Sequence, residues 1–166
     1  MSSWKAQYFT LDELITTSRA GFDDAQRKGA SDPATCAKLA ELAATILDPI
    51  RAEAKKPVRV NSGYRCLALN NAINGSKTSQ HMKGEAADIC VPGLSEQGLW
   101  ELWRWIAFDS GLKFGQCIFE DARPNTEGGA WIHISLGPPY RKPGGEVLTW
   151  TPAGYKKVTA RPGKRA

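Results

Sequence analysis

The order of two kinds of periodicity along the chain constrains its fold more than any other feature. Apolar residues recur at helical spacing early on and predict a long amphipathic helix from Pro33 to about Glu53. Short apolar runs typical of strands follow at residues 57–60 and 86–91, then at 116–120 and 131–136. Helices that come first and strands that cluster late favour an α+β fold over regular βαβ alternation.

Local signals refine the helices. Thr10 and Glu13 have the spacing of a capping box, so a short helix is predicted to begin near Leu11. Asp32 is expected to cap the long helix, and Pro49 is expected to kink it. Two further helices are predicted: a short one over about residues 67–73, and one that begins after Ser95 and ends at Gly111.

Two stretches are predicted to lack regular structure. Residues 21–32 are polar and contain glycine, so we expect a loop there. Clusters of Gly and Pro after Leu136 predict irregular structure to the end of the chain. We therefore predict one domain over residues 1–140 and a basic, Pro/Gly-rich tail over residues 141–166 that is not a separate domain.

The composition is that of a soluble globular protein, with 42% apolar and 23% charged residues. No apolar run approaches the roughly 20 residues that span a bilayer, and the N-terminus has no apolar h-region. We expect no signal peptide, and a chain that is made in a cytoplasm and stays there unless something else releases it. The cysteines form no C-x-x-C pair, so we expect reduced thiols and not a metal site: Cys36, Cys66, Cys90 and Cys117.

The net charge of +5 comes from the C-terminal tail. Residues 141–166 contain seven of the 22 Lys and Arg residues, and their only acidic residue is Glu146. Such a tail could attract polyanions, among them anionic polymers of a cell envelope. A solvated tail that only aids solubility is the alternative. We do not expect specific nucleic-acid binding, because neither stacking aromatic residues nor a helix-turn-helix pattern accompanies the charge.

The only two histidines of the chain lie where metal ligands are expected. His81 and Asp88 lie in one loop whose small residues let the imidazole and the carboxylate converge. Strand alternation places Ile132 and Ile134 on one face and His133 on the other. Two imidazoles and one carboxylate are typical of catalytic zinc, which keeps a fourth position for water. Magnesium and calcium prefer oxygen ligands and fit less well.

Two motifs resemble the DD-peptidase family of zinc enzymes: Val60-Asn-Ser-Gly-Tyr-Arg65 and Ser79-x-His81-x-x-Gly84-x-Ala86-x-Asp88. The strand Trp131-Ile-His133 is similar to the family's third-ligand strand, and the resemblance covers about residues 8–136. It implies a hedgehog/DD-peptidase-like fold, in which helices pack on a small, mostly antiparallel sheet that carries the zinc site. It also implies one Zn²⁺ per chain, held by His81, Asp88 and His133.

The resemblance does not identify the general base directly, because this chain departs from the family pattern at one position. Many relatives have an acidic residue three positions before the last histidine, where this chain has Ala130. We assign the base to Glu120, which resembles the glutamate of phage-type relatives whose Q-x-I-x-E strand precedes W-x-H. Asp121 and Glu127 are the rivals.

Two more residues are expected to act on the substrate. Arg65 is expected to stabilise the oxyanion or to clamp a substrate carboxylate, since its planar fork suits such anions; a structural ion pair is the alternative. Ser79 is expected to orient the substrate or the His81 loop, and a hydroxyl that caps this loop is the alternative.

The resemblance implies hydrolysis of peptide bonds in bacterial peptidoglycan. Relatives include D-alanyl-D-alanine carboxypeptidases and phage endolysins that cut the L-alanyl-D-glutamate bond. We favour a monomeric, endolysin-like endopeptidase that reaches the cell wall after release, because no signal peptide is seen and the tail is basic. A D-Ala-D-Ala carboxypeptidase is the first alternative, and a non-catalytic zinc-containing binding module is the second.

Overall fold

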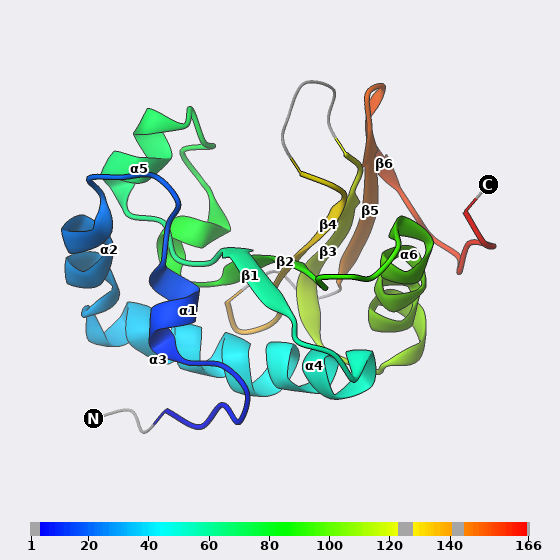
Figure 1. Ribbon diagram of the computed structural model, residues 1–166, viewed down its shortest axis with the longest axis horizontal. Coiled ribbons are helices and arrows are strands. Elements are labelled where there is room, and N and C mark those ends of the chain that lie inside the picture. Colours follow the sequence, from blue (N-terminus) through cyan, green and yellow to red (C-terminus); the bar gives the residue numbers. More distant parts are fainter. Residues whose placement is uncertain (1–3, 123–127, 141–144, 166) are drawn as a thin grey trace.

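The strands form one six-stranded sheet in the order β1-β2-β4-β3-β5-β6 (Figure 1). The computed structural model describes residues 4–122, 128–140 and 145–165. Every neighbouring pair is antiparallel except β3 and β5, which are parallel. The strands are β1 (Arg59–Ser62), β2 (Ala86–Cys90), β3 (Phe114–Glu120), β4 (Trp131–Leu136), β5 (Glu146–Thr151) and β6 (Gly154–Lys157). The predicted α+β fold is confirmed, and it agrees with a hedgehog/DD-peptidase-like architecture.

The helical elements include π and 3₁₀ segments. They are α1 (Leu11–Ile15), α2 (Asp23–Ala30), α3 (Pro33–Leu42), the π-helical η1 (Ala43–Leu47), α4 (Asp48–Ala54), α5 (Leu67–Ala72), the 3₁₀-helical η2 (Gln80–Lys83), α6 (Glu96–Arg104) and the π-helical η3 (Trp105–Asp109). The capping box of Thr10 and Glu13 is confirmed, since the Thr10 hydroxyl accepts from the Glu13 backbone and the Glu13 carboxylate accepts from the Thr10 backbone.

The long helix begins as predicted. The Asp32 carboxylate accepts from the Thr35 backbone, so the predicted N-cap is confirmed. Helical structure continues to Ala54 through the π-helical turn η1, in which the Asp48 backbone N–H donates to the Ala43 carbonyl. Pro49, where a kink was predicted, lies in the first turn of α4, just after this π-helical turn.

The prediction of a loop over residues 21–32 is wrong, because α2 lies there. Its inward anchor is a polar residue, Gln26, which is only 1% exposed. The Gln26 amide donates to the carbonyls of Ile15 and Tyr64 and accepts from the backbone of Cys66. Apolar periodicity cannot reveal a helix whose buried contact is made by an amide.

The prediction of irregular structure after Leu136 is also wrong for residues 146–157, which form β5 and β6. Strand β5 pairs in parallel with β3, and β6 pairs with β5. The glycines and prolines that suggested irregular structure flank these strands. The run Glu146–Thr151 is rich in β-branched and aromatic residues that favour a strand.

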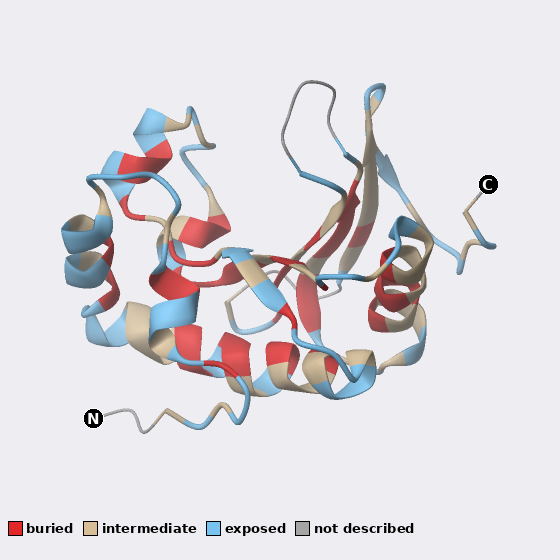
Figure 2. Cartoon of the chain, in the orientation of Figure 1, coloured by how far each residue is buried: buried red, intermediate tan, exposed pale blue. Residues whose placement is uncertain are grey.

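The two faces of the sheet differ in character. One face carries Ile89, Cys117, Phe119, Ile132 and Ile134, which belong to the main hydrophobic core. Helices α3 and α6 contact β4 on this side of the molecule, and buried residues gather between helices and sheet (Figure 2). The core fixes the strand register, so the alternate residues must point to the other face.

All four cysteines are free; Cys66 and Cys117 are buried, and burial raises the pKa of the Cys117 thiol well above its usual range. Within residues 4–122, 128–140 and 145–165, the helices are all too short or too polar to cross a membrane.

Candidate metal and catalytic site

Polar side chains of neighbouring strands lie in register on the face of the sheet opposite the core. Asp88 of β2 pairs with His133 of β4, and His133 pairs with Ile118 of β3. One row further along, Glu120 of β3 pairs with Trp131 of β4. The register therefore brings the side chains of three strands together around one region of this face.

His81 reaches this region from the 3₁₀ helix η2. Gly84 ends that helix with φ +69°, a left-handed conformation that glycine adopts readily, and lets the chain turn back into β2. The His81 backbone carbonyl accepts from the Arg65 backbone at 3.1 Å. The His81 Nδ1 lies 2.8 Å from the Gly63 carbonyl oxygen, which can only accept, so Nδ1 carries the proton. The other ring nitrogen, Nε2, faces Asp88.

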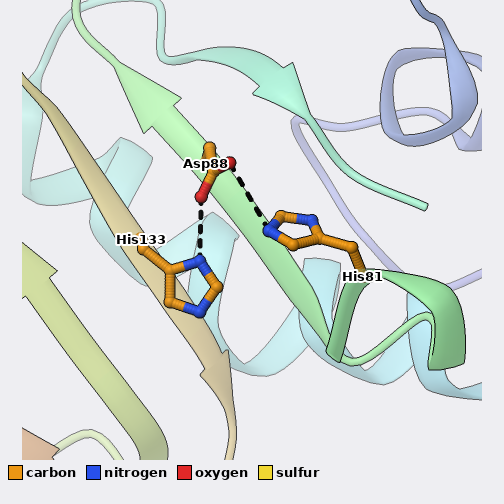
Figure 3. A group of neighbouring side chains, drawn as sticks. All are labelled: His81, Asp88 and His133. Carbon is orange, nitrogen blue, oxygen red and sulfur yellow. Dashed lines mark hydrogen bonds and ion pairs between the residues drawn. The ribbon is translucent and has the colours of Figure 1, made fainter. Parts of the chain in front are cut away.

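Asp88 lies between the two histidines (Figure 3). Its Oδ2 is 3.4 Å from His81 Nε2, and its Oδ1 is 2.8 Å from His133 Nδ1. Burial would raise the pKa of the Asp88 carboxyl, but the charges and hydrogen bonds of His81 and His133 outweigh burial and hold this pKa well below its usual range. Asp88 is thus held as a carboxylate, the form that binds metal ions.

His133 is bound on both sides of its ring. Its Nδ1 faces Asp88, and its Nε2 lies 2.9 Å from the amide oxygen of Gln80. Gln80 is buried and donates its amide N–H to Gln116. His81 and His133 meet edge to face, with ring centroids 5.1 Å apart.

These three side chains fit a zinc ion. One donor atom from each of His81, Asp88 and His133 lies within 4.8 Å of the others. Two atoms that are each about 2.1 Å from a tetrahedral ion lie about 3.4 Å apart. His81 Nε2 and Asp88 Oδ2 have this separation, whereas His133 Nδ1 and Asp88 Oδ1 lie at the 2.8 Å of a direct hydrogen bond. The structure therefore brings together the three residues that the sequence predicted as ligands.

Glu120 lies at the end of β3, on the same face as the metal-ligand candidates. Its side chain is 5% exposed, and Oε1 accepts a hydrogen bond from the Tyr155 hydroxyl at 3.0 Å. Glu120, Tyr155, His81, Asp88 and His133 all line one cavity of about 1070 Å³. The predicted base therefore faces the same space as the predicted metal site.

Arg65 lines this cavity too. Its guanidinium donates to Asn70 Oδ1 at 3.3 Å and to Ser62 Oγ at 3.2 Å. Burial lowers its pKa, and the charge of Asp88 works against that effect. These two acceptors are neutral oxygens and not carboxylates.

The remaining predicted residues fall in different places. Ser79 lines the cavity and precedes η2, but its side chain does not cap that helix, so the capping alternative is wrong. Asp121 accepts from Arg165 at 2.6 Å. Ala130 lines a second cavity. Glu127 lies outside the described residues.

The second cavity, of about 640 Å³, adjoins the first. Asp88 and Trp131 line both cavities. Arg59 and Asn61 of β1 and the hydroxyl residues 16–18 line the second cavity only. Of the three predicted ligands, Asp88 lines both cavities, whereas His81 and His133 line the first cavity only.

Sequence reasoning missed the residues that support the site from the C-terminal strands. Tyr155 of β6 donates to Glu120, and Glu146 of β5 accepts from Gln116 at 2.6 Å. The tail that carries them is also tied to the domain, since Arg161 pairs with Asp109 and Arg165 pairs with Glu96 and Asp121. The β-branched and aromatic residues of 146–151 were a signal that could have revealed this region.

Comparison with known proteins places the chain in a family. A search of curated proteins finds no match. A family model described as Peptidase M15 matches residues 7–120, a span that contains Arg65, His81 and Asp88 and ends at Glu120. His133 lies beyond the matched span. Because the match covers more than half of the chain, this protein belongs to the peptidase M15 family.

Proposed function

We propose that this protein is a zinc-dependent endopeptidase that cuts peptide bonds in the stem peptides of bacterial peptidoglycan. The observation that carries the proposal is the convergence of His81, Asp88, His133, Glu120 and Arg65 on one cavity. M15 peptidases are zinc-dependent, and the family suggests peptidoglycan-type substrates.

His81 Nε2, Asp88 and His133 Nδ1 are the atoms and groups that would hold the zinc ion. Zinc bound by two imidazoles and one carboxylate supplies Lewis-acid chemistry, which polarises the scissile carbonyl and makes water acidic enough to attack near neutral pH. The hydrogen bond from His81 Nδ1 to Gly63 holds the His81 ring in the orientation that this role needs.

Glu120 acts as general base. It takes the proton of the attacking water on a carboxylate oxygen and then gives it to the departing amine. The hydrogen bond from Tyr155 to Oε1 fixes the Glu120 carboxylate at the cavity wall. Burial of Glu120 among protein atoms limits the number of positions that its carboxylate can take.

Arg65 and Ser79 bind the substrate. Arg65 presents a charged guanidinium to the cavity, where it either stabilises the oxyanion or holds a substrate carboxylate. Stem peptides of peptidoglycan carry free carboxylates, so the charge is complementary. Ser79 lines the cavity, and its hydroxyl does not cap η2. This hydroxyl orients the substrate.

The two adjoining cavities support an endopeptidase over a carboxypeptidase. A carboxypeptidase must accommodate only one terminal residue on one side of the scissile bond. Here the cavities of about 1070 and 640 Å³ share Asp88 and Trp131 as lining residues, so the space near the predicted ligands is larger than a single terminal residue needs. Arg59 offers a second positive charge on the far side.

The test is digestion of purified peptidoglycan, with mass spectrometry of the released fragments. The proposal predicts cleavage of an internal bond, such as that between L-Ala and D-Glu, which a chelator abolishes and added zinc restores. Release of terminal D-Ala alone would replace it with a D-Ala-D-Ala carboxypeptidase. Zinc binding without any cleavage would overturn it in favour of a non-catalytic binding module.

A further inference from the structure

The cavity that contains the predicted metal site carries opposite charges on two sides. Arg65 lines it and donates to Ser62 of β1, whereas Glu146 lines it from β5. The order of the sheet places β1 and β5 on opposite sides of β2, β4 and β3 (Figure 1). A ligand in this cavity therefore meets the positive charge of Arg65 on the β1 side and the negative charge of Glu146 on the β5 side.

The Glu146 carboxylate has bonding capacity that the described protein does not use. Its Oε2 accepts from Gln116 Nε2 at 2.6 Å, and its side chain makes no other hydrogen bond to the described residues. No Lys or Arg in residues 4–122, 128–140 and 145–165 forms an ion pair with it. Glu146 is half-buried, and burial of a charge without a counter-charge costs free energy. A cationic group of a ligand is the partner that suits Oε1.

Glu146 differs in this respect from the other acidic residues of the cavity. Asp88 lies between two imidazoles, and Glu120 accepts from the Tyr155 hydroxyl. The hydrogen bond that ties Glu146 to Gln116 does not require a charge, because the oxygen of an amide would accept it equally well. The negative charge of Glu146 is therefore not explained by the link between β5 and β3.

The strand register gives the distance of Glu146 from the predicted metal site. Ile118 pairs with both His133 and Leu148, so these three residues form one row across β4, β3 and β5. Glu146 precedes Leu148 by two positions on β5. With strands about 4.8 Å apart and a rise of about 3.3 Å per residue, the Cα atoms of His133 and Glu146 lie about 12 Å apart. Because side chains from both molecules span part of this distance, an extended peptide reaches Glu146 about two or three residues from the scissile bond.

We propose that Glu146 is a specificity-determining residue that binds a side-chain amine of the substrate, near the scissile bond but not at it. The proposal rests on the proposed function and adds the chemical class of the substrate, a stem peptide that contains a diamino acid with a free, protonated amine. The amine donates to Glu146 Oε1 while Gln116 keeps its bond to Oε2. Arg65 holds or stabilises negative charge on the other side of the cavity.

Three peptides test the amine without any change in the protein. They are L-Ala-γ-D-Glu-L-Lys, the same peptide acetylated on the lysine amine, and the same peptide dimethylated there. Acetylation removes the positive charge, whereas dimethylation adds similar bulk and keeps it. Wild-type kcat/KM should be about tenfold lower for the acetylated peptide, through KM, because hydrogen bonds to charged groups are stronger than neutral ones. The dimethylated peptide should resemble the unmodified one. Equal values for the unmodified and acetylated peptides would overturn the proposal.

Glu146→Gln tests the residue. The amide keeps the size of the side chain and an acceptor for Gln116 but loses the charge. Its kcat/KM should be equally low for all three peptides, with zinc content unchanged. Glu41→Gln, at an exposed position of α3, is the matched control and should discriminate as the wild type does. Wild-type discrimination in Glu146→Gln would overturn the proposal.

A binding measurement separates this proposal from the proposed function. Calorimetry with the Glu120→Gln protein measures the affinity for each peptide without cleavage, and the unmodified peptide should bind about tenfold more tightly than the acetylated one. A wild-type protein that cleaves none of the peptides would sink the proposed function, whereas this difference in affinity would still support the amine site. Equal affinities, or no binding of either peptide, would overturn the amine site.

Discussion

The two histidines of the site are held by different means. His81 lies within the span matched by the family model, and the carbonyl of Gly63, a backbone group, fixes its tautomer. His133 lies beyond that span, and side chains hold its ring: Asp88 on one side and Gln80 on the other. One half of the site is thus built on backbone and the other half on side chains.

This difference teaches where each half is vulnerable. Every residue has a backbone carbonyl, so the His81 half does not depend on a particular side chain at position 63. It depends on the backbone conformation that places the Gly63 carbonyl beside His81. The His133 half depends on the chemical identity of residues far apart in the sequence, since Asp88 and Gln80 lie 45 and 53 residues before His133. Substitutions should therefore affect the first half through folding and the second half through chemistry.

Removing either histidine should have the largest effect, and this effect should be the same for both halves of the site. His81→Ala and His133→Ala each leave two ligands, so we expect loss of zinc and at least about a thousandfold loss of hydrolysis, because a metal ion supplies several kcal/mol of transition-state stabilisation. Zinc content and the rate of fragment release check this. If one variant kept its zinc and its activity, that histidine would not be a ligand.

Glu120→Gln should have the next largest effect. The amide keeps the shape of the side chain and its acceptor for Tyr155 but cannot take a proton. We expect a loss of about a hundredfold or more in kcat, with zinc content unchanged. Asp121→Asn, one residue further along, is the matched control and should keep its activity. Full turnover in Glu120→Gln would move the base to Asp121 or Glu127.

Sequence patterns gave the elements whose buried faces are apolar. Burial against one core explains the elements that were predicted. These are the long helix, the strands around residues 86–90 and 131–136, and the alternation of Ile132, His133 and Ile134. Helix α2 escaped because Gln26 anchors it by three hydrogen bonds to distant backbone groups. Such bonds depend on the tertiary structure and leave no periodic signal.

The residues of the candidate site also fall into two groups, those that the sequence could predict and those that depend on the tertiary structure. His81 and His133 could be selected because the chain has only two histidines, Asp88 because of its motif with His81, and Glu120 because of the strand in which it lies. The supporting residues could not, because Gln116 meets Glu146 only in the register of two parallel strands. Tyr155 meets Glu120 only once β6 has paired with β5. Glutamine and tyrosine are too common to stand out without that register.

Gly63→Ala tests the backbone half. A Cβ at Gly63 would overlap the carbonyl oxygen of Leu14, which also accepts from the Tyr64 backbone. We expect a loss of about 1–3 kcal/mol in the free energy of unfolding from overpacking, with weaker zinc binding because the carbonyl that holds His81 must shift. Gly163→Ala, where a Cβ meets open space, is the control for denaturant unfolding. Wild-type stability and zinc affinity in Gly63→Ala would remove the case for a rigid backbone anchor.

Tyr155→Phe tests the side-chain half with the smallest change, the loss of one hydroxyl. Tyr155 is 55% exposed, so the fold should tolerate phenylalanine. One hydrogen bond contributes about 1 kcal/mol, so kcat should fall by roughly fivefold while KM and zinc content stay constant. In Glu120→Gln the same substitution should cost less, because interacting residues are not additive. Tyr8→Phe, at another exposed tyrosine, is the control. Equal losses in both backgrounds would show that Tyr155 acts without Glu120.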